Sequence, residues 1–245
     1  MFAALPLQAN EEVVLGLSQN RVAITANFDG SEILIFGAVK RETAIPKGEP
    51  LHVIVAIEGP KQKLTVRRKD KRFGIWINTE SVDISAAPAF YAIATSAPFD
   101  DILTATEDLR YHVSVPLAIR SVGAASQAEH PEEFTDAIIR IRSNSGLYQL
   151  LEGAVRFDQQ TLFRTNIALP SNLTEGDYKT RILLTRSGKV VSHYETTIDV
   201  RKVGLERFLF NLSREKPLIY GLLSLTIAIA AGWGASAIFR VFQIG

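Results

Sequence analysis

No charged residue occurs between Pro217 and Phe239. As a helix, the 22 residues from Leu218 to Phe239 would extend about 33 Å, and the hydrocarbon core of a bilayer is about 30 Å thick. A helix in the core of a soluble protein rarely lacks a polar face over such a length. We therefore predict one C-terminal transmembrane helix over residues 217–239, surrounded by the lipid bilayer and followed by a short tail, residues 240–245.

Small residues recur every four positions along this segment, at Ser224, Ala228, Gly232 and Ser236. Residues with this spacing lie along one side of a helix, and small side chains there allow close approach of a second membrane helix. This row predicts packing against another integral membrane protein or against a second copy of the chain. The alternative is that glycine, alanine and serine are simply common in membrane helices.

A second apolar pattern precedes the span, within residues 203–216. Its members follow the i, i+3, i+4, i+7 spacing of one helical face: Leu205, Phe208, Leu209 and Leu212. This pattern indicates an amphipathic helix that lies in the membrane interface, or one that packs on the remainder of the protein. The sequence leaves both interpretations open.

Two signals disagree on orientation. Four cations precede the span, Lys202, Arg207, Arg214 and Lys216, and Arg240 follows it, which favours a cytoplasmic location for the large N-terminal part. Residues 1–10 are either disordered or the last part of a signal peptide, since an apolar run ends at Leu7–Ala9 before two glutamates. A signal peptide would place the large part in the periplasm.

Residues 11–202 are expected to form a mainly β ectodomain. Segments rich in β-branched and aromatic residues recur about every ten residues between Val13 and Thr95, separated by turn residues such as Asp29-Gly30. This spacing favours a sandwich or barrel, and we predict an immunoglobulin-like sandwich-type fold with a helical insertion. The expected divisions are a first β domain (11–122), a linker and helical segment (123–152) and a second β unit (153–202).

Two details support the helical insertion and the sandwich. The alternation of strands is lost from Pro98 to about Val113 and again from Pro131 to about Leu151, where apolar residues take helical spacing. The segment Leu173–Tyr178 resembles the tyrosine corner of immunoglobulin-like sandwiches, in which a tyrosine hydroxyl bonds back to the preceding turn.

One stretch concentrates positive charge. Seven cations fall within twelve residues: Lys61, Lys63, Arg67, Arg68, Lys69, Lys71 and Arg72. They are followed by Phe73 and Trp76, and they predict an exposed β-hairpin that docks on anionic lipid, a small anion or an acidic partner, with Arg67, Arg68 and Arg72 as forked donors. The alternative is a solvated hairpin whose lysines prevent edge pairing.

The residues that commonly carry chemistry form no familiar set. The chain has no cysteine, and a net charge of +1 (27 Lys plus Arg against 26 Asp plus Glu) gives no field that would attract nucleic acid. The histidines, His52, His112, His130 and His193, lack the spacing of metal ligands. We expect no catalytic residue, metal or cofactor, and the carboxylate pairs Asp100-Asp101 and Glu132-Glu133 suit helix starts. The rival hypothesis is an enzyme with a polar site at Glu107, Asp108 and His112.

Three segments carry a family resemblance: EEVVLGLSQNRVAITANFDGSEILIFGAVKR, VRRKDKRFGIWIN and the C-terminal VRKVGLERFLFNLSREKPLIYGLLSL through AGWGASAIFR. They resemble a family of alphaproteobacterial transmembrane proteins, from about Glu11 to Arg240. The resemblance implies a signal peptide, a periplasmic ectodomain at the inner membrane and a sulfite-exporter-type permease as neighbour, and it supplies no catalytic residues. We therefore expect a membrane-anchored accessory or binding protein, with an enzyme or a structural envelope protein as alternatives.

Overall fold

The structure is a computed structural model, which describes residues 11–24, 28–41, 50–119, 130–202, 209 and 212–243. The chain divides into two compact units, which are described separately. The β unit comprises residues 1–22 and 28–201, and the membrane unit comprises residues 23–27 and 202–245.

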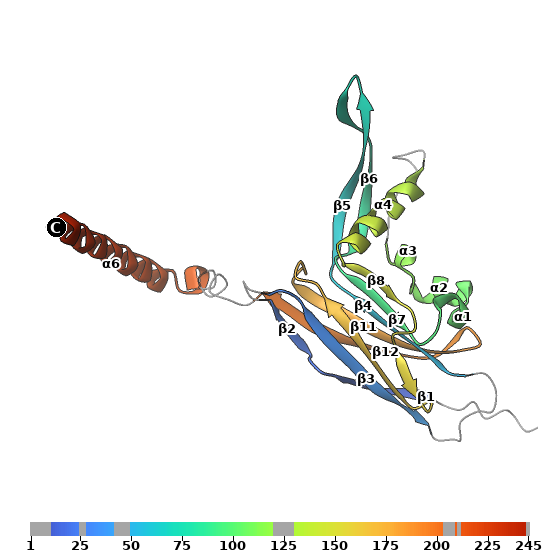
Figure 1. Cartoon of the computed structure of the whole chain (residues 1–245). Helices are drawn as coiled ribbons and strands as arrows, with labels where there is room; N and C mark the ends of the chain where they lie inside the picture. The colour runs from blue at the N-terminus through green and yellow to red at the C-terminus, as the bar shows by residue number, and fades with distance from the viewer. Residues whose placement is uncertain are drawn as a thin grey trace, which may run out of the picture. The chain divides into compact units, whose positions relative to one another are not determined.

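Most strands belong to two sheets (Figure 1). Sheet A has the order β1-β3-β10-β9, formed by β1 (Glu11–Leu17), β3 (Ser31–Arg41), β10 (Leu162–Leu169) and β9 (Arg156–Asp158). Sheet B has the order β2-β12-β11-β4-β7-β8, formed by β2 (Arg21–Ile24), β12 (Lys189–Lys202), β11 (Gly176–Arg186), β4 (His52–Glu58), β7 (Tyr91–Thr95) and β8 (Tyr148–Leu151). The remaining strands, β5 (Lys61–Arg72) and β6 (Ile75–Pro88), form a separate antiparallel hairpin.

Sheet B lies in the middle of the β unit and is covered on both faces. Every residue of β7 is buried, and β4 is buried from Val53 to Ile57, as expected for a strand with a layer on either side. Sheet A covers one face: β10 alternates buried and exposed residues, and Glu11 of β1 forms an ion pair with Arg186 of β11. The helices and the hairpin pack on the other face, around Ile54, Ile93 and Leu183.

The prediction of a mainly β fold with a helical insertion is confirmed, and the strands pair differently from the predicted division. Strands from the ranges 11–122 and 153–202 share both sheets, since β3 pairs with β10 and β4 pairs with β11. The two expected β units are thus parts of one β unit. The tie expected at Leu173–Tyr178 is present, because the Tyr178 hydroxyl donates to the Thr174 carbonyl oxygen at 2.7 Å.

The helical insertion contains α1 (Phe99–Ile102), α2 (Ala105–Tyr111), α3 (Val115–Ala118) and α4 (Pro131–Asn144). Pro131 begins α4 at a position where the missing N–H costs nothing, and Phe134 and Ile138 are its buried residues. The helical segment ends earlier than expected, because Gly146 takes a φ of +71° and Tyr148–Leu151 form β8, which pairs in parallel with β7. The first part of the expected linker and helical segment, residues 123–129, lies outside the described residues.

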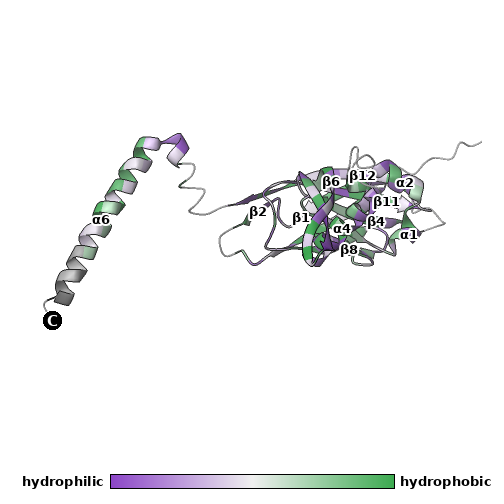
Figure 2. Cartoon of the chain, turned by 90° about the horizontal axis from the view of Figure 1, so that it is seen from above, coloured by the Kyte–Doolittle hydropathy of each residue, from purple (hydrophilic) through white to green (hydrophobic). Residues whose placement is uncertain are grey.

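The membrane unit contains α6 (Pro217–Gln243), 27 residues long. Among the described residues, Pro217–Ala235 is the one helical stretch long and apolar enough to cross a bilayer (Figure 2). None of this stretch is buried. The predicted span is confirmed, and the helix continues four residues past Phe239. Leu209 and Leu212 are helical, whereas Leu205 and Phe208 of the predicted interfacial face lie outside the described residues.

Candidate functional site

The basic stretch forms one strand of a long hairpin, as predicted. β5 and β6 pair from Lys61 opposite Pro88 to Arg72 opposite Ile75. The connection is a two-residue turn in which Phe73 and Gly74 both have positive φ, 50° and 82°, as a type I′ turn requires. The twelve residues of β5 extend about 40 Å, and Figure 1 shows the hairpin extending away from sheets A and B.

The half of the hairpin nearest the sheets, residues 61–68 and 79–88, which we call the root, is held by apolar contacts. Val82 and Ile84 of β6 are buried, and Leu64 and Val66 of β5 pack against the same cluster. This cluster also includes Phe134 and Ile138, the two buried residues of α4. The root therefore has a fixed position within the β unit.

The other half, residues 69–78, we call the tip, and each of its residues is exposed. Its large apolar side chains have little or no cover: Phe73 is 104% exposed, Trp76 67% and Ile75 64%. Phe73 also occupies a left-handed position that costs a residue with a Cβ about 1–2 kcal/mol and that Asn, Asp or Gly usually fills in such turns. Neither turn geometry nor core packing accounts for a phenylalanine at this position.

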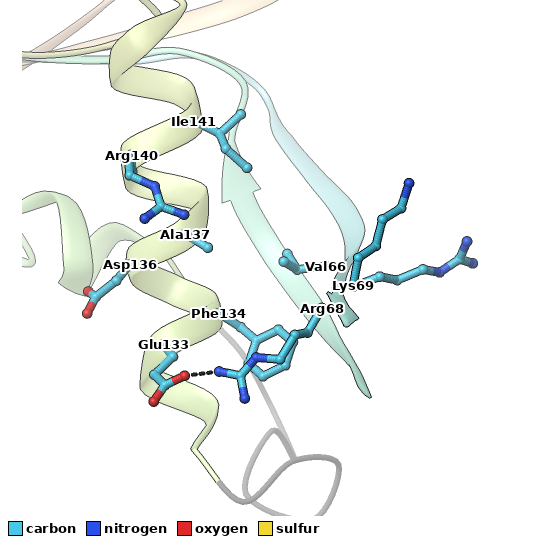
Figure 3. Close-up of a pocket in the computed structure, with 10 residues that line it drawn as sticks. Val66, Arg68, Lys69, Glu133, Phe134, Asp136, Ala137, Arg140 and Ile141 are labelled. Carbon is cyan, nitrogen blue, oxygen red and sulfur yellow. Dashed lines mark ion pairs between the residues drawn. The ribbon is translucent and has the colours of Figure 1, made fainter. Parts of the chain in front are cut away.

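Three of the seven cations are engaged within the protein. Lys61 pairs with Glu58 at 3.0 Å, and Arg72 approaches Asp70 at 3.8 Å. Arg68 pairs with Glu80 at 3.3 Å and with Glu133 of α4, and its guanidinium lies 5.4 Å from the centre of the Phe134 ring (Figure 3). Arg68, expected to be a donor to an external anion, connects the hairpin to α4.

The other four cations remain available. No ion pair with a residue of the described part of the chain is found for Lys63, Arg67, Lys69 or Lys71. Figure 3 shows the Lys69 side chain directed away from α4. Positive charge without an internal partner among these residues is thus concentrated on β5, toward the tip.

A groove of about 700 Å³ lies between β5 and α4 (Figure 3). It is lined by side chains of both charges and by apolar ones: Val66, Arg67, Arg68, Lys69, Glu133, Phe134, Asp136, Ala137, Arg140 and Ile141. The Arg68–Glu133 pair crosses it, so the groove is partly occupied by the protein's own side chains.

The residues of the rival enzyme hypothesis have structural contacts. An Asp108 carboxylate oxygen accepts from the amides of Val113 at 3.0 Å and Ser114 at 2.7 Å, and Glu107 accepts from the Val190 amide at 3.1 Å. His112 ends α2 in a left-handed conformation, φ 51°. These contacts hold the chain reversal after α2 and its neighbour β12 in place.

His112 also lines a polar pocket of about 420 Å³ beside β11, together with Arg181. Arg181 donates to the carbonyl oxygens of Tyr111 and His112 at 2.6 and 3.1 Å, and to the Tyr91 hydroxyl at 2.9 Å. Burial raises the pKa of Tyr91 to about 12, so this phenol stays protonated at neutral pH. Both terminal nitrogens of Arg181 at this pocket therefore already donate to groups of the protein.

The remaining histidines lie apart. His52 approaches the Ser96 hydroxyl at 3.3 Å, and burial lowers the pKa of its ring. His130 lies 3.4 Å from Glu132, and His193 packs on Tyr111 with ring centres 5.9 Å apart. Within the described residues, no group of three or more His, Asp or Glu side chains is arranged to hold a metal ion.

On α6, Ser224, Ala228 and Gly232 are exposed, and the side chain of Ser236 lies outside the described part of the chain. The Ser224 hydroxyl donates to the Tyr220 carbonyl oxygen at 2.9 Å, and that of Thr226 donates to the Leu222 carbonyl oxygen at 2.8 Å. These two hydroxyls of the span are therefore satisfied within its own helix, as an apolar environment requires. Packing along the small-residue row stays a prediction.

The sequence interpretation missed the apolar content of the tip beyond Phe73 and Trp76. Ile75 and Ile77 are exposed there as well. The available signal was the order Phe-Gly followed by Ile-Trp-Ile, since a two-residue turn places the residues on both sides of it at the end of a hairpin.

Comparison with known proteins agrees with the membrane helix and gives no activity. No curated protein matches the sequence. The family model described as "Putative transmembrane protein (Alph_Pro_TM)" matches residues 12–241, which cover the strands of both sheets, the hairpin and nearly all of α6. The chain therefore belongs to this family of transmembrane proteins.

Proposed function

We propose that the protein is a membrane-anchored accessory protein that acts by binding rather than by catalysis. Hairpin β5–β6 is the observation that carries the proposal. Its root is fixed against α4, and its tip exposes Phe73, Ile75 and Trp76 beside cations that have no ion pair with the described residues. A rigid element that ends in uncovered apolar and cationic side chains suits contact with another molecule.

In this proposal the β unit lies in the periplasm at the inner membrane, and residues 240–245 lie in the cytoplasm. The resemblance of the sequence to its family supports this orientation, and the cations Lys202, Arg214 and Lys216 before the span oppose it. The same resemblance makes a sulfite-exporter-type permease the first protein partner to test. A second copy of the chain is the alternative partner for α6.

Site-specific photo-crosslinking in native membranes tests the proposal. A photo-reactive amino acid replaces Phe73 at the tip in one variant and Leu162, an exposed apolar residue of β10, in a matched control. We expect the tip variant to form crosslinks to a membrane component, lipid or protein, and the control to form none.

The opposite result has a clear meaning. Equal crosslinking at both positions, or none at the tip, would show that the hairpin makes no specific contact and would remove the basis of the proposal. If the tip does form crosslinks to a protein, purification of the full chain in mild detergent identifies this partner, and we expect it to be the permease.

A further inference from the structure

We infer that the tip of hairpin β5–β6 is a second membrane attachment, which binds the surface of an anionic lipid bilayer. This inference rests on the proposed function, because it names the component that the hairpin contacts. Its support comes from the order of side chains along the tip, from their charges and from the end of sheet B at which the hairpin begins.

The side chains of the tip are ordered as a bilayer interface requires. Phe73 is at the very end, and the next pairs of the ladder place Arg72 opposite Ile75 and Lys71 opposite Trp76. Residues directly opposite in a ladder share a face, so each face of the tip has an apolar side chain beside a cation. Apolar groups at the end can enter the acyl region while the long cationic side chains extend back to the phosphates.

The residue types fit a lipid surface in particular. An indole is amphipathic and prefers the boundary between hydrocarbon and water, which matches Trp76 near the turn of the hairpin. Lysine side chains interact with phosphates as point charges and need no fixed acidic partner. Lys69, Lys71 and Arg67 have no ion pair among the described residues.

Charge is distributed unevenly along the hairpin. Glu80 and Asp83 lie on β6 toward the root, whereas Lys69, Lys71 and Arg72 lie in the tip. Asp70, the acid of the tip, accepts from the Lys71 amide at 2.8 Å and pairs with Arg72. The whole chain has a net charge of +1, so the positive potential is a local property of this element.

The hairpin leaves sheet B at the end from which the chain continues toward α6. Glu58, just before β5, is opposite Lys179, and Lys179 is opposite Thr197 in β12, which ends at Lys202. The hairpin and the segment that continues to the membrane helix therefore start from the same end of sheet B.

Fluorescence of the full chain in proteoliposomes tests the inference. The sequence has two tryptophans, Trp76 and Trp233, so Trp233→Phe leaves Trp76 as the sole indole probe. The bilayers are phosphatidylglycerol mixed with phosphatidylcholine, or phosphatidylcholine alone, each with and without brominated acyl chains. We expect Trp76 emission to be blue-shifted and quenched by bromine in the anionic bilayer, and the quenching to decrease at about 1 M salt, where the Debye length is about 3 Å.

Charge variants sharpen the test. Arg67→Gln, Lys69→Gln and Lys71→Gln together should lower the docking equilibrium constant on the order of 100-fold, since each cation near an anionic surface contributes roughly a tenfold or smaller factor. The matched control replaces Arg156, Arg164 and Lys189 with Gln, which removes the same charge from exposed positions outside the hairpin. This control should quench as the parent does.

Phe73→Asn separates docking from folding. Asparagine is favoured in a type I′ turn, so this variant keeps the hairpin and removes the terminal ring. We expect weaker quenching of Trp76 with unchanged stability of the β unit. Quenching equal to that of the parent would overturn the inference.

One further outcome would also overturn it. Trp76 emission that is the same in plain and brominated anionic bilayers would show that the tip stays in water. If crosslinking from position 73 in native membranes then captures a membrane protein, the proposed accessory function stands and the lipid inference alone falls.

Discussion

At the scale of single residues, the least exposed ion pairs of the described structure share the carboxylate of Glu11, and one of them joins the two sheets. Glu11 of β1 pairs with Arg41 of β3 at 2.7 Å and with Arg186 of β11 at 3.0 Å, and its side chain is 2% exposed. Arg41 also donates to the Thr161 hydroxyl at 3.5 Å and to the Gln160 carbonyl oxygen. Two guanidinium groups therefore depend on a single carboxylate.

We predict that Glu11→Gln lowers the free energy of unfolding by about 3–5 kcal/mol, because it leaves two cations without their buried counter-charge. Urea denaturation of the full chain in detergent, followed by circular dichroism, measures this change. Glu12→Gln is the matched control, since Glu12 is 69% exposed and 3.8 Å from Lys40, and its effect should be below about 1 kcal/mol. Equal effects of the two changes would contradict a structural role of the buried pairs.

Ionisation of three buried tyrosine side chains should lower the stability of the β unit at alkaline pH. Burial raises the pKa values of Tyr91, Tyr148 and Tyr178 to about 12, from the ordinary value of 10.0. The folded state holds these protons more tightly than the unfolded state, so their contribution to stability is complete below pH 10 and is lost as the pH rises toward 12.

We therefore predict that the free energy of unfolding falls between about pH 10 and about pH 12. In the Tyr91→Phe variant, the total loss over this range should be smaller by at most about 2–3 kcal/mol. Unfolding in urea at a series of pH values measures the slope. Tyr194→Phe, a change at an exposed position, should leave the slope unaltered. A parent and a Tyr91→Phe variant with the same slope would show that this phenol ionises equally in both states.

At the scale of elements, the sequence was informative where a pattern is local. The span, the basic hairpin and the helix after Pro131 each follow from residues that are neighbours along the chain. The end of α4 was not predictable from periodicity, because Leu147 continues the helical spacing while Gly146 reverses the backbone with φ +71°. The internal partner of Arg68 was not predictable for a related reason, since Glu133 belongs to a helix distant in the sequence.

For α6 we predict that Gly232→Leu abolishes association with a second copy or with a co-purifying permease. Beyond the neighbouring backbone of the helix itself, no atom lies within 4 Å of a Cβ built at this position, so the new side chain fills the groove of the helix without internal conflict. Ala230→Leu, on another side of the helix, is the control. Both variants should reach the membrane, and an unchanged complex in mild-detergent purification of Gly232→Leu would reject this face as the contact.

At the scale of the whole molecule, orientation is the property with the sharpest test. We predict that a phosphatase that is active only outside the cytoplasm is silent when fused after Gly245, while the β unit is accessible to protease from the periplasm. The family resemblance motivates this expectation against the cations that precede the span. An active phosphatase at Gly245, together with a protected β unit, would reverse the assignment.

The sequence did not predict that strands from residues 11–122 and from residues 153–202 share the same sheets. Buried runs such as Val53–Ile57 indicate a strand covered on both faces, without specifying which strands lie beside it. Its neighbour β11 is chosen by side-chain packing across the whole β unit, where Val55 lies opposite Ile182. Patterns along the chain contain no information about such distant partners.

The pairing of β3 with β10 affects how the chain can be made. Ile35 lies opposite Thr165, so one edge of β3 remains unpaired until β10, which is synthesised much later, has been made. Contacts between such distant segments slow folding, and an unpaired strand edge is a template for aggregation until its partner arrives. During synthesis and any export, the early strands therefore need protection, and the β unit completes its sheets only when β12 has emerged, shortly before the apolar helix that follows it.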